Sequence, residues 1–302
     1  MNQCGFIGLG IMGKPMAKNL LAKGCPCLVH DLDTQAVKEL VAEGAVAATP
    51  MEMGRQCGIV FTILPNGAIV REVLFGSGGV AQEMKQGSLV VDMSSVTPSE
   101  SRSCADELSG KGIGFLDAPV SGGEPKAIDG TLAFMVGGLQ KDFDRALPYF
   151  ELMGSSAVLI GAYGSGSITK LTNQVIVNLT IAAVSEAFVL AAKAGADPEK
   201  VYRAIRGGLA GSAVLDAKLP MMVNRNFKPG GKLSINLKDI KNVMATAHEI
   251  DVPMPMTGQL LEIMQAMKVG GHLNEDHGGI VQYFEQLAGF RVEKHKDGEV
   301  PA

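Results

Sequence analysis

The stretch that decides the fold stands at the start of the chain and reads Cys4-Gly5-Phe6-Ile7-Gly8-Leu9-Gly10-Ile11-Met12-Gly13. An apolar run typical of a strand leads into a glycine-rich turn, and a helical pattern over about residues 12–23 follows. Glycines at the first, third and sixth places of such a turn permit a tight backbone and the close approach of a pyrophosphate to the helix N-terminus. The stretch predicts a dinucleotide-binding strand–turn–helix unit.

An acidic residue after the second apolar run, residues 27–30, supports this prediction. Asp31 lies 18 residues after Gly13, where a carboxylate can accept a hydrogen bond from a ribose 2′-hydroxyl. The same carboxylate would repel a 2′-phosphate, and the residues that follow it, 32–34, offer no cation for one. We therefore expect NAD as the cofactor, with NADP as the alternative. The other interpretation is a glycine-rich turn beside an ordinary surface aspartate.

The first half of the chain continues to alternate between strand and helix patterns. A helix is expected at 34–43, and strands at 59–64, 88–93, 115–117 and 133–136. Alternation of this kind is typical of α/β proteins with a parallel, doubly wound sheet. From the glycine-rich segment 161–166 onward the pattern is helical, beginning with a long helix over about residues 167–194. We predict a Rossmann-type NAD-binding domain at 1–163, an all-helical substrate and oligomerisation domain at 164–292, and a flexible tail at 293–302.

Composition and charge narrow the class of protein. The 302 residues are 46% hydrophobic and carry a net charge of −4 without a basic stripe, which argues against a nucleic-acid partner. The first residues, Met1-Asn2-Gln3, lack the positive segment of a signal peptide. The apolar long helix contains polar and charged residues, which favours a helix buried in protein over a membrane span. We expect a soluble, cytoplasmic enzyme with no membrane partner.

The cysteines point to a reducing compartment. Their number is odd and most lie in apolar, strand-like surroundings, which is typical of buried free thiols. The pair Cys25 and Cys27 lacks metal-ligand spacing, so we predict no metal site. The five residues are Cys4, Cys25, Cys27, Cys57 and Cys104.

Three loops follow predicted strands, at the edge where open α/β sheets bind their ligands. Two of them, Leu64-Pro65-Asn66 and Met93-Ser94-Ser95, are expected to contact the nicotinamide ribose. The third contains Ser121-Gly122-Gly123, whose hydroxyl and backbone N–H groups would suit a substrate carboxylate. In each case the alternative is an ordinary loop without a ligand.

A lysine near the start of the long helix is the candidate catalytic residue. Lys170 follows Gly164 and Gly166, and Asn173 lies three residues on, on the same helix face. An ammonium facing a cleft between the domains, with a pKa lowered by the cleft and the helix end, could protonate an alkoxide as it forms from a carbonyl. The alternative is a solvated lysine at a helix start, where the helix dipole disfavours a cation.

Taken together, these motifs resemble the β-hydroxyacid dehydrogenase family, which includes 3-hydroxyisobutyrate dehydrogenase. The resemblance covers about residues 4–290, and its four motifs occur in the expected order. They are the cofactor signature at 6–20, the substrate loop at 117–123, the segment Gly164-x-Gly166-x-x-x-Lys170, and the late pair Lys238-Asp239. Within the family, stretches at 120–132, 204–212, 215–218 and 225–230 are similar to the subgroup that reduces tartronate semialdehyde to glycerate.

The resemblance implies a role for each candidate residue. Lys170 would be the general acid and base, Ser121 with its two glycines would hold the carboxylate, and Lys238 would reach the cofactor. Asn173 would orient the substrate or the lysine. Many family members place an asparagine four residues after the lysine, where this chain has Gln174, and Asn173 stands one residue earlier. A homodimer or homotetramer is expected.

Three other functions stay open on the sequence. One is a sister dehydrogenase acting on 3-hydroxyisobutyrate, threonate or another small β-hydroxy acid. The others are a non-catalytic dinucleotide-binding module and an imine reductase. Relatives of both kinds usually lack the catalytic lysine, so Lys170 argues against them.

Overall fold

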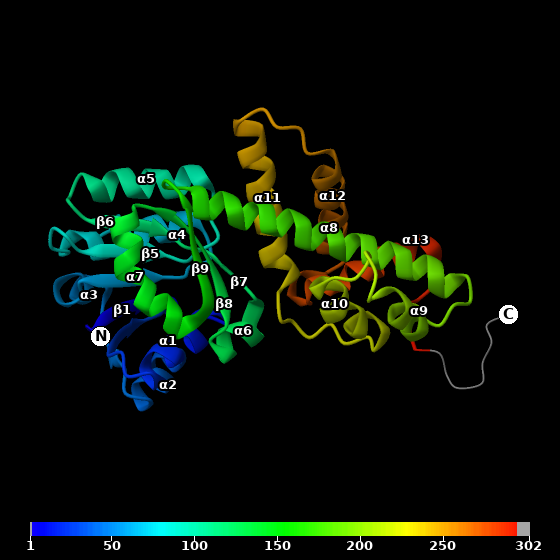
Figure 1. Cartoon of the computed structure of the whole chain (residues 1–302), viewed down its shortest axis with the longest axis horizontal. Helices are drawn as coiled ribbons and strands as arrows, with labels where there is room; N and C mark the ends of the chain where they lie inside the picture. Colours follow the sequence, from blue (N-terminus) through cyan, green and yellow to red (C-terminus); the bar gives the residue numbers. More distant parts are fainter. Residues whose placement is uncertain (1, 295–302) are drawn as a thin grey trace. The chain divides into compact units, whose positions relative to one another are not determined.

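The computed structural model describes residues 2–294 and divides the chain into two compact units, Met1–Leu171 and Thr172–Ala302 (Figure 1). The division falls inside helix α8 (Ser165–Lys193), eight residues after the end of the first predicted domain. Most of the predicted flexible tail lies outside the described residues.

The first unit contains a twisted sheet whose first six strands are all parallel. Their spatial order is β3-β2-β1-β4-β5-β6, so the predicted parallel, doubly wound arrangement is confirmed. Predicted and observed strand ends differ by at most two residues where both exist. The bounds are β1 (Cys4–Ile7), β2 (Cys27–His30), β3 (Val46–Ala47), β4 (Ile59–Thr62), β5 (Leu89–Asp92) and β6 (Gly114–Asp117).

The last part of the sheet is mixed, which the alternation of the sequence did not predict. Strand β8 (Leu132–Gly138) runs antiparallel to β6 and to the short β7 (Val120–Ser121), and parallel to β9 (Gly154–Gly161). Neither β7 nor β9 was predicted from the sequence. Strand β7 has only two residues, which is too short for a recognisable pattern. Strand β9 begins with Gly-Ser-Ser, a sequence that is typical of a turn.

Helices cover both faces of this sheet (Figure 1), because successive side chains of each strand point to opposite faces. Phe6 and Phe61 pack in the core under α1, α2 and α7, while Ile7 and Val60 pack in the core under α3, α4 and α5. The bounds are α1 (Gly13–Ala22), α2 (Thr34–Ala42), α3 (Pro50–Gln56), α4 (Gly67–Phe75), η1 (Val80–Gln82), α5 (Pro98–Ser109), α6 (Gly123–Asp129) and α7 (Gln140–Met153).

The described part of the second unit is helical, as predicted. Besides most of α8 it contains α9 (Pro198–Ile205), α10 (Ala213–Val223), α11 (Leu233–Glu249), α12 (Pro255–Val269), η2 (His272–Asn274), η3 (His277–Ile280) and α13 (Val281–Ala288).

Helix α8 is long and apolar enough to cross a membrane by length and composition, and 44% of its most apolar window is buried in the protein. Two of its polar side chains, Asn178 and Ser185, are fully buried and bond to backbone oxygens one turn earlier, at 2.9 and 2.7 Å. Because its buried polar groups are satisfied, α8 has the character of a core helix.

Candidate active site

The glycine-rich turn between β1 and α1 is shaped by close backbone contacts. Gly8 has a φ of +100°, and a Cβ there would lie 2.2 Å from the carbonyl oxygen of Ile63. A Cβ on Gly13 would lie 1.9 Å from the carbonyl oxygen of Gly8. At Gly10, by contrast, a Cβ would meet no described atom within 4 Å. The first and third glycines therefore serve the packing of the turn, while the second leaves its outer side open to a ligand.

Asp31 lies at the edge of this turn. Its carboxylate accepts hydrogen bonds from the N–H groups of Leu9 at 2.5 Å and Asp33 at 2.8 Å. Among the described residues, no side chain caps the first turn of α1, whose preceding residue is Met12. Unpaired N–H groups at a helix start attract a phosphate, and the carboxylate beside them suits ribose hydroxyls. These residues fit a nicotinamide dinucleotide.

A buried aspartate that the sequence analysis did not select connects the next two loops. Asp92, at the end of β5, accepts hydrogen bonds at 2.8 Å from the Thr62 hydroxyl and at 2.5 Å from the Ser94 hydroxyl. The Ser94 hydroxyl in turn accepts the Leu64 N–H at 2.8 Å. Burial raises the pKa of Asp92 to about 6, although the hydrogen bonds from Ser94 and Thr62 oppose this shift. The network fixes the loops that begin after β4 and β5 relative to each other.

Several of the predicted loop residues have a structural role in addition to the proposed functional one. Asn66 caps α4, since its side-chain oxygen accepts the Ile69 N–H at 3.0 Å. Ser121 ends β7 and is partly buried. The two glycines after it have φ values of +136° and +68°, a region that few other residues adopt. Gly122 and Gly123 are therefore required by the backbone at the start of α6, whatever they bind.

The segment that carries Lys170 is fixed by Asp117. One carboxylate oxygen of Asp117 accepts the Gly164 N–H at 2.9 Å and the other accepts the Ser167 N–H at 2.8 Å. A Cβ on Gly166 would lie 2.2 Å from the Asp117 carbonyl oxygen, so only glycine permits this approach. Burial raises the pKa of the Asp117 carboxyl, while the bonds from Ser167 and Gly164 oppose it. Lys170 lies in the second turn of α8, slightly later than predicted, and is partly buried.

A cluster of polar side chains in the second unit connects the two remaining candidates. The amide nitrogen of Gln174 donates to Asn236 at 3.1 Å and to Asp239 at 2.7 Å. The amide oxygen of Gln174 accepts from Asn173 at 3.0 Å, and the ammonium of Lys238 lies 3.1 Å from the Asp239 carboxylate. The centre of the cluster is therefore Gln174, which the sequence analysis noted only as a departure from the family pattern. A glutamine within an otherwise apolar helix was the signal available in the sequence, and the structure buries it.

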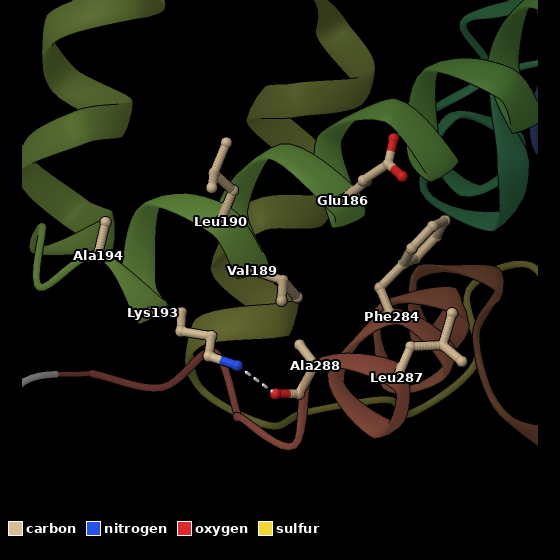
Figure 2. Close-up of a pocket in the computed structure, with 8 residues that line it drawn as sticks. All are labelled: Glu186, Val189, Leu190, Lys193, Ala194, Phe284, Leu287 and Ala288. Carbon is tan, nitrogen blue, oxygen red and sulfur yellow. Dashed lines mark hydrogen bonds between the residues drawn. The ribbon is translucent and has the colours of Figure 1, made fainter.

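A separate groove of about 520 Å³ follows α8 and α13 and contains none of the predicted site residues (Figure 2). Its walls are mostly apolar, and the Lys193 ammonium at one end donates to the Ala288 carbonyl at 2.6 Å. The lining residues are Glu186, Val189, Leu190, Lys193, Ala194, Phe284, Leu287 and Ala288.

A doubly wound sheet with this turn and this acidic residue defines a nicotinamide-dinucleotide-binding oxidoreductase. Residues 3–161 match the family model described as the NAD binding domain of 6-phosphogluconate dehydrogenase. Residues 164–284 match the one described as NAD-binding of NADP-dependent 3-hydroxyisobutyrate dehydrogenase. The chain belongs to the β-hydroxyacid dehydrogenase family, that of 3-hydroxyisobutyrate dehydrogenase, and is an NAD(P)-dependent oxidoreductase acting on CH–OH groups.

Individual relatives agree with this assignment. The chain is 40% identical over 289 residues to the 2-hydroxy-3-oxopropionate reductase of Escherichia coli, covering 95% of this chain and 99% of that one. It is 32% identical over 290 residues to the mitochondrial 3-hydroxyisobutyrate dehydrogenase of Mus musculus, covering 93% and 87%. A solved 3-hydroxyisobutyrate dehydrogenase from Mycobacterium tuberculosis, with L-serine, superposes with a TM-score of 0.86 at 29% identity, covering 93% and 98%.

Proposed function

We propose that this enzyme reduces tartronate semialdehyde (2-hydroxy-3-oxopropanoate) to D-glycerate with NADH, reversibly, with Lys170 as general acid and base. The observation that carries the proposal is the anchoring of the Gly164-x-Gly166-x-x-x-Lys170 segment by Asp117, which holds a lysine at a defined place in the second turn of α8. The 40% identity to the Escherichia coli reductase over nearly the whole of both chains supports the choice of substrate.

In this proposal each side chain has one task. The hydroxyl of Ser121 and the N–H groups near Gly122 and Gly123 hold the substrate carboxylate. The nicotinamide, when bound, supplies the hydride. Lys170 gives a proton to the carbonyl oxygen as it becomes an alkoxide, and takes that proton back in the reverse direction. Asn173, held by Gln174, orients the substrate or the lysine.

Asp31 favours NADH over NADPH. Its carboxylate is fixed by two backbone N–H groups at the edge of the glycine-rich turn, and in this proposal it faces the position of a 2′-phosphate. Bringing the two negative charges together would cost free energy, although solvent reduces that cost.

The main alternative is a different small acid of the same chemical class. The likeness to 3-hydroxyisobutyrate dehydrogenases favours 3-hydroxyisobutyrate, and a 36% identity over 95% of the chain to 2-(hydroxymethyl)glutarate dehydrogenase of Eubacterium barkeri favours a larger acid. Threonate is a further candidate. All of these substrates share a carboxylate for Ser121 and an oxygen that Lys170 could protonate.

Initial rates on a panel of aldehyde acids and their alcohols, each with NADH or NADPH and its oxidised form, test the proposal. Tartronate semialdehyde with NADH should give the highest kcat/KM. A higher value for another acid would replace the substrate but leave the mechanism. A protein that binds NADH and turns over no member of the panel would be a non-catalytic module.

The second unit also supports a homodimer or homotetramer, which we place in the cytoplasm. Ile176 and Leu190 on α8 are 62% and 73% exposed, and the apolar groove lies beside Leu190 (Figure 2). Exposed apolar side chains next to a groove are typical of a surface that meets a second copy. Light scattering should therefore give the mass of a dimer or a tetramer, and a monomer at micromolar concentration would contradict this part of the proposal.

A further inference from the structure

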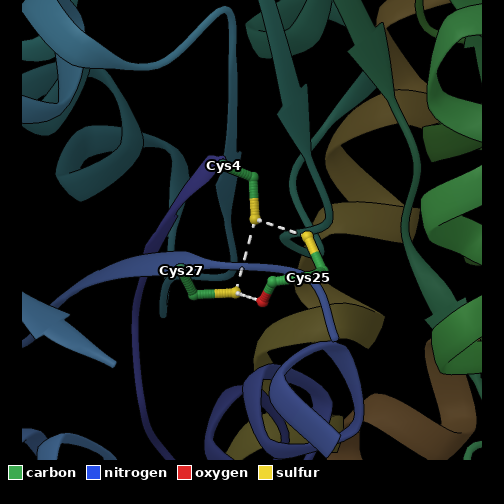
Figure 3. A group of neighbouring side chains, drawn as sticks. All are labelled: Cys4, Cys25 and Cys27. Atoms are coloured by element: carbon green, nitrogen blue, oxygen red, sulfur yellow. Dashed lines mark hydrogen bonds between the residues drawn. The ribbon is translucent and has the colours of Figure 1, made fainter. Parts of the chain in front are cut away.

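Three thiols converge at the amino end of the sheet (Figure 3). The sulfur of Cys4 lies 3.5 Å from that of Cys27 and 3.7 Å from that of Cys25, and all three lie within 4.8 Å of one another. Each residue is at most 2% exposed. From the sequence, only Cys25 and Cys27 were treated as a pair, and Cys4 was not expected to join them.

The backbone explains why they meet. Cys4 and Cys27 begin neighbouring parallel strands and stand opposite each other in register. Cys25 lies two residues earlier, in the loop that leads into β2, and the Cys4 N–H bonds to the Pro26 carbonyl in that loop at 3.0 Å. The other two cysteines, Cys57 and Cys104, belong to the core on the opposite face of the sheet.

We propose that Cys4 and Cys25 form a reversible disulfide when the enzyme meets a hydroperoxide, while Cys27 stays a thiol. The Cys25 thiolate attacks a peroxide oxygen, which breaks the O–O bond and gives a sulfenic acid and hydroxide or alkoxide. The Cys4 thiol then attacks that sulfur, the S–S bond forms, and water leaves. The two cysteines lose two electrons, and the peroxide gains them.

Cys25 is the first thiol to react because of its place and its neighbours. It lies in the loop before β2, between two exposed residues, Gly24 and Pro26, whereas Cys4 and Cys27 lie in strands. Hydrogen bonds from the thiols of Cys27 and Cys4 lower the pKa of Cys25, and the thiolate is the reactive form.

Cys4 is better placed to form a disulfide with Cys25 than with Cys27. Cys4 and Cys27 are held by the hydrogen bonds between two strands, whose separation of about 4.8 Å is near the lower end of the Cα distances that disulfides allow. Cys25 lies outside the paired strands, so its Cα distance to Cys4 is not set by the strand separation. A disulfide also leaves no charge in this apolar core, whereas a metal ion bound by three thiolates would leave a net charge there.

The bond would close a loop that contains the whole cofactor turn and α1. The link lies at the amino end of β1, whereas the glycine-rich turn lies at its carboxyl end. Oxidation should therefore raise the midpoint temperature of thermal unfolding, because the disulfide constrains the unfolded chain. The affinity for NADH should stay within about twofold of that of the reduced enzyme.

The test is mass mapping of the full-length protein after treatment with stoichiometric hydrogen peroxide and native alkylation. The wild type should lose two hydrogens, give a peptide joined through Cys4 and Cys25, and return to the thiol form with dithiothreitol. Cys27→Ala should still form this link, as should the matched control Cys104→Ala. Cys4→Ala and Cys25→Ala should form none, and their midpoints should not rise on oxidation.

Three results would overturn the inference. They are a Cys4–Cys27 link in the wild type, a link only between two chains, and oxidation of Cys25 to the sulfinic acid with no internal link. Because each is read from the wild-type protein, the inference stays testable even if an alanine variant does not fold.

Discussion

The carboxylate of Asp117 accepts the backbone N–H of Ser167 at 2.8 Å, so the last residue of β6 holds the first turn of the helix that carries Lys170. The same carboxylate accepts the Gly164 N–H. Because Asp117 is 1% exposed, both donors would lose their acceptor in its absence, and water could not simply replace it.

Asp117→Ala should lower the free energy of unfolding by about 1–3 kcal/mol for buried donors left unpaired. It should also lower kcat, since the start of α8 is no longer fixed, while the Kd for NADH stays within about twofold. Urea unfolding, steady-state kinetics and NADH titration measure these effects. The matched control is Asp197→Ala, which removes the cap of α9 and should cost about 0.5–2 kcal/mol without changing kcat. A folded Asp117→Ala enzyme with wild-type kcat would show that the anchor has no part in catalysis.

The effect of Asp31 on cofactor choice can be separated from its effect on the turn. Asp31→Asn keeps an acceptor oxygen for the Leu9 N–H and removes the negative charge. The ratio of kcat/KM for NADH to that for NADPH should fall by about tenfold, equivalent to ~1.4 kcal/mol of relieved repulsion. A wild-type enzyme that prefers NADPH would contradict the argument and would place a cation near the 2′-phosphate.

Whether a part of this site could be predicted from the sequence depends on how far apart in the chain the contacting residues lie. The glycine-rich turn, Asp31 and the strand ends were predicted because each has a recognisable pattern within one strand–turn–helix unit. Gly164 and Gly166 were predicted from their spacing before Lys170, although the residue that they contact, Asp117, is remote in the sequence.

The tasks of Asp92, Asp117 and Gln174 were not predicted, because their partners are remote in the sequence. Asp92 bonds to a residue 30 positions away, Asp117 to one 50 positions away, and Gln174 to one 65 positions away. A local pattern records only that a polar residue ends a strand or interrupts an apolar helix. Which donor it meets is decided by the topology of the sheet and the packing of the helices.

The raised pKa of Asp92 predicts a dependence of stability on pH. Its folded-state pKa, about 6, lies above the value of an unfolded aspartate. The contribution of Asp92 to the free energy of unfolding is therefore fully present below about pH 4 and is lost as the pH rises through 6. Asp92→Asn mimics the protonated form and keeps an oxygen for the Thr62 and Ser94 hydroxyls. The stability of the variant relative to wild type should increase by on the order of 3 kcal/mol between pH 4 and pH 7.5.

Urea unfolding at four or five pH values checks this, with Asp129→Asn, on the short helix α6, as a surface control that should show no such trend. A constant difference between Asp92→Asn and wild type across the range would mean that Asp92 titrates normally in the fold.

Removing the ammonium of Lys170 tests the chemistry itself. A general acid contributes roughly 10²–10⁴-fold in rate, so Lys170→Ala should lower kcat by this factor while the protein folds and binds NADH. Lys170→Arg should recover little, because a guanidinium keeps the charge but does not readily release a proton. Lys193→Ala, at the other end of α8, is the matched control and should retain full kcat, since among the described residues its ammonium bonds only the Ala288 carbonyl.

The competing interpretation, a solvated lysine near a helix start, makes the opposite prediction. It expects Lys170→Ala to keep its activity and to gain a little stability, because a cation near a helix N-terminus is unfavourable. NADH-linked turnover of the folded variant distinguishes the two. Activity within about threefold of wild type would remove Lys170 from the mechanism, because a residue that supplies the proton cannot be lost at so small a cost in rate. The anchoring by Asp117 would then have only a structural role, in starting α8.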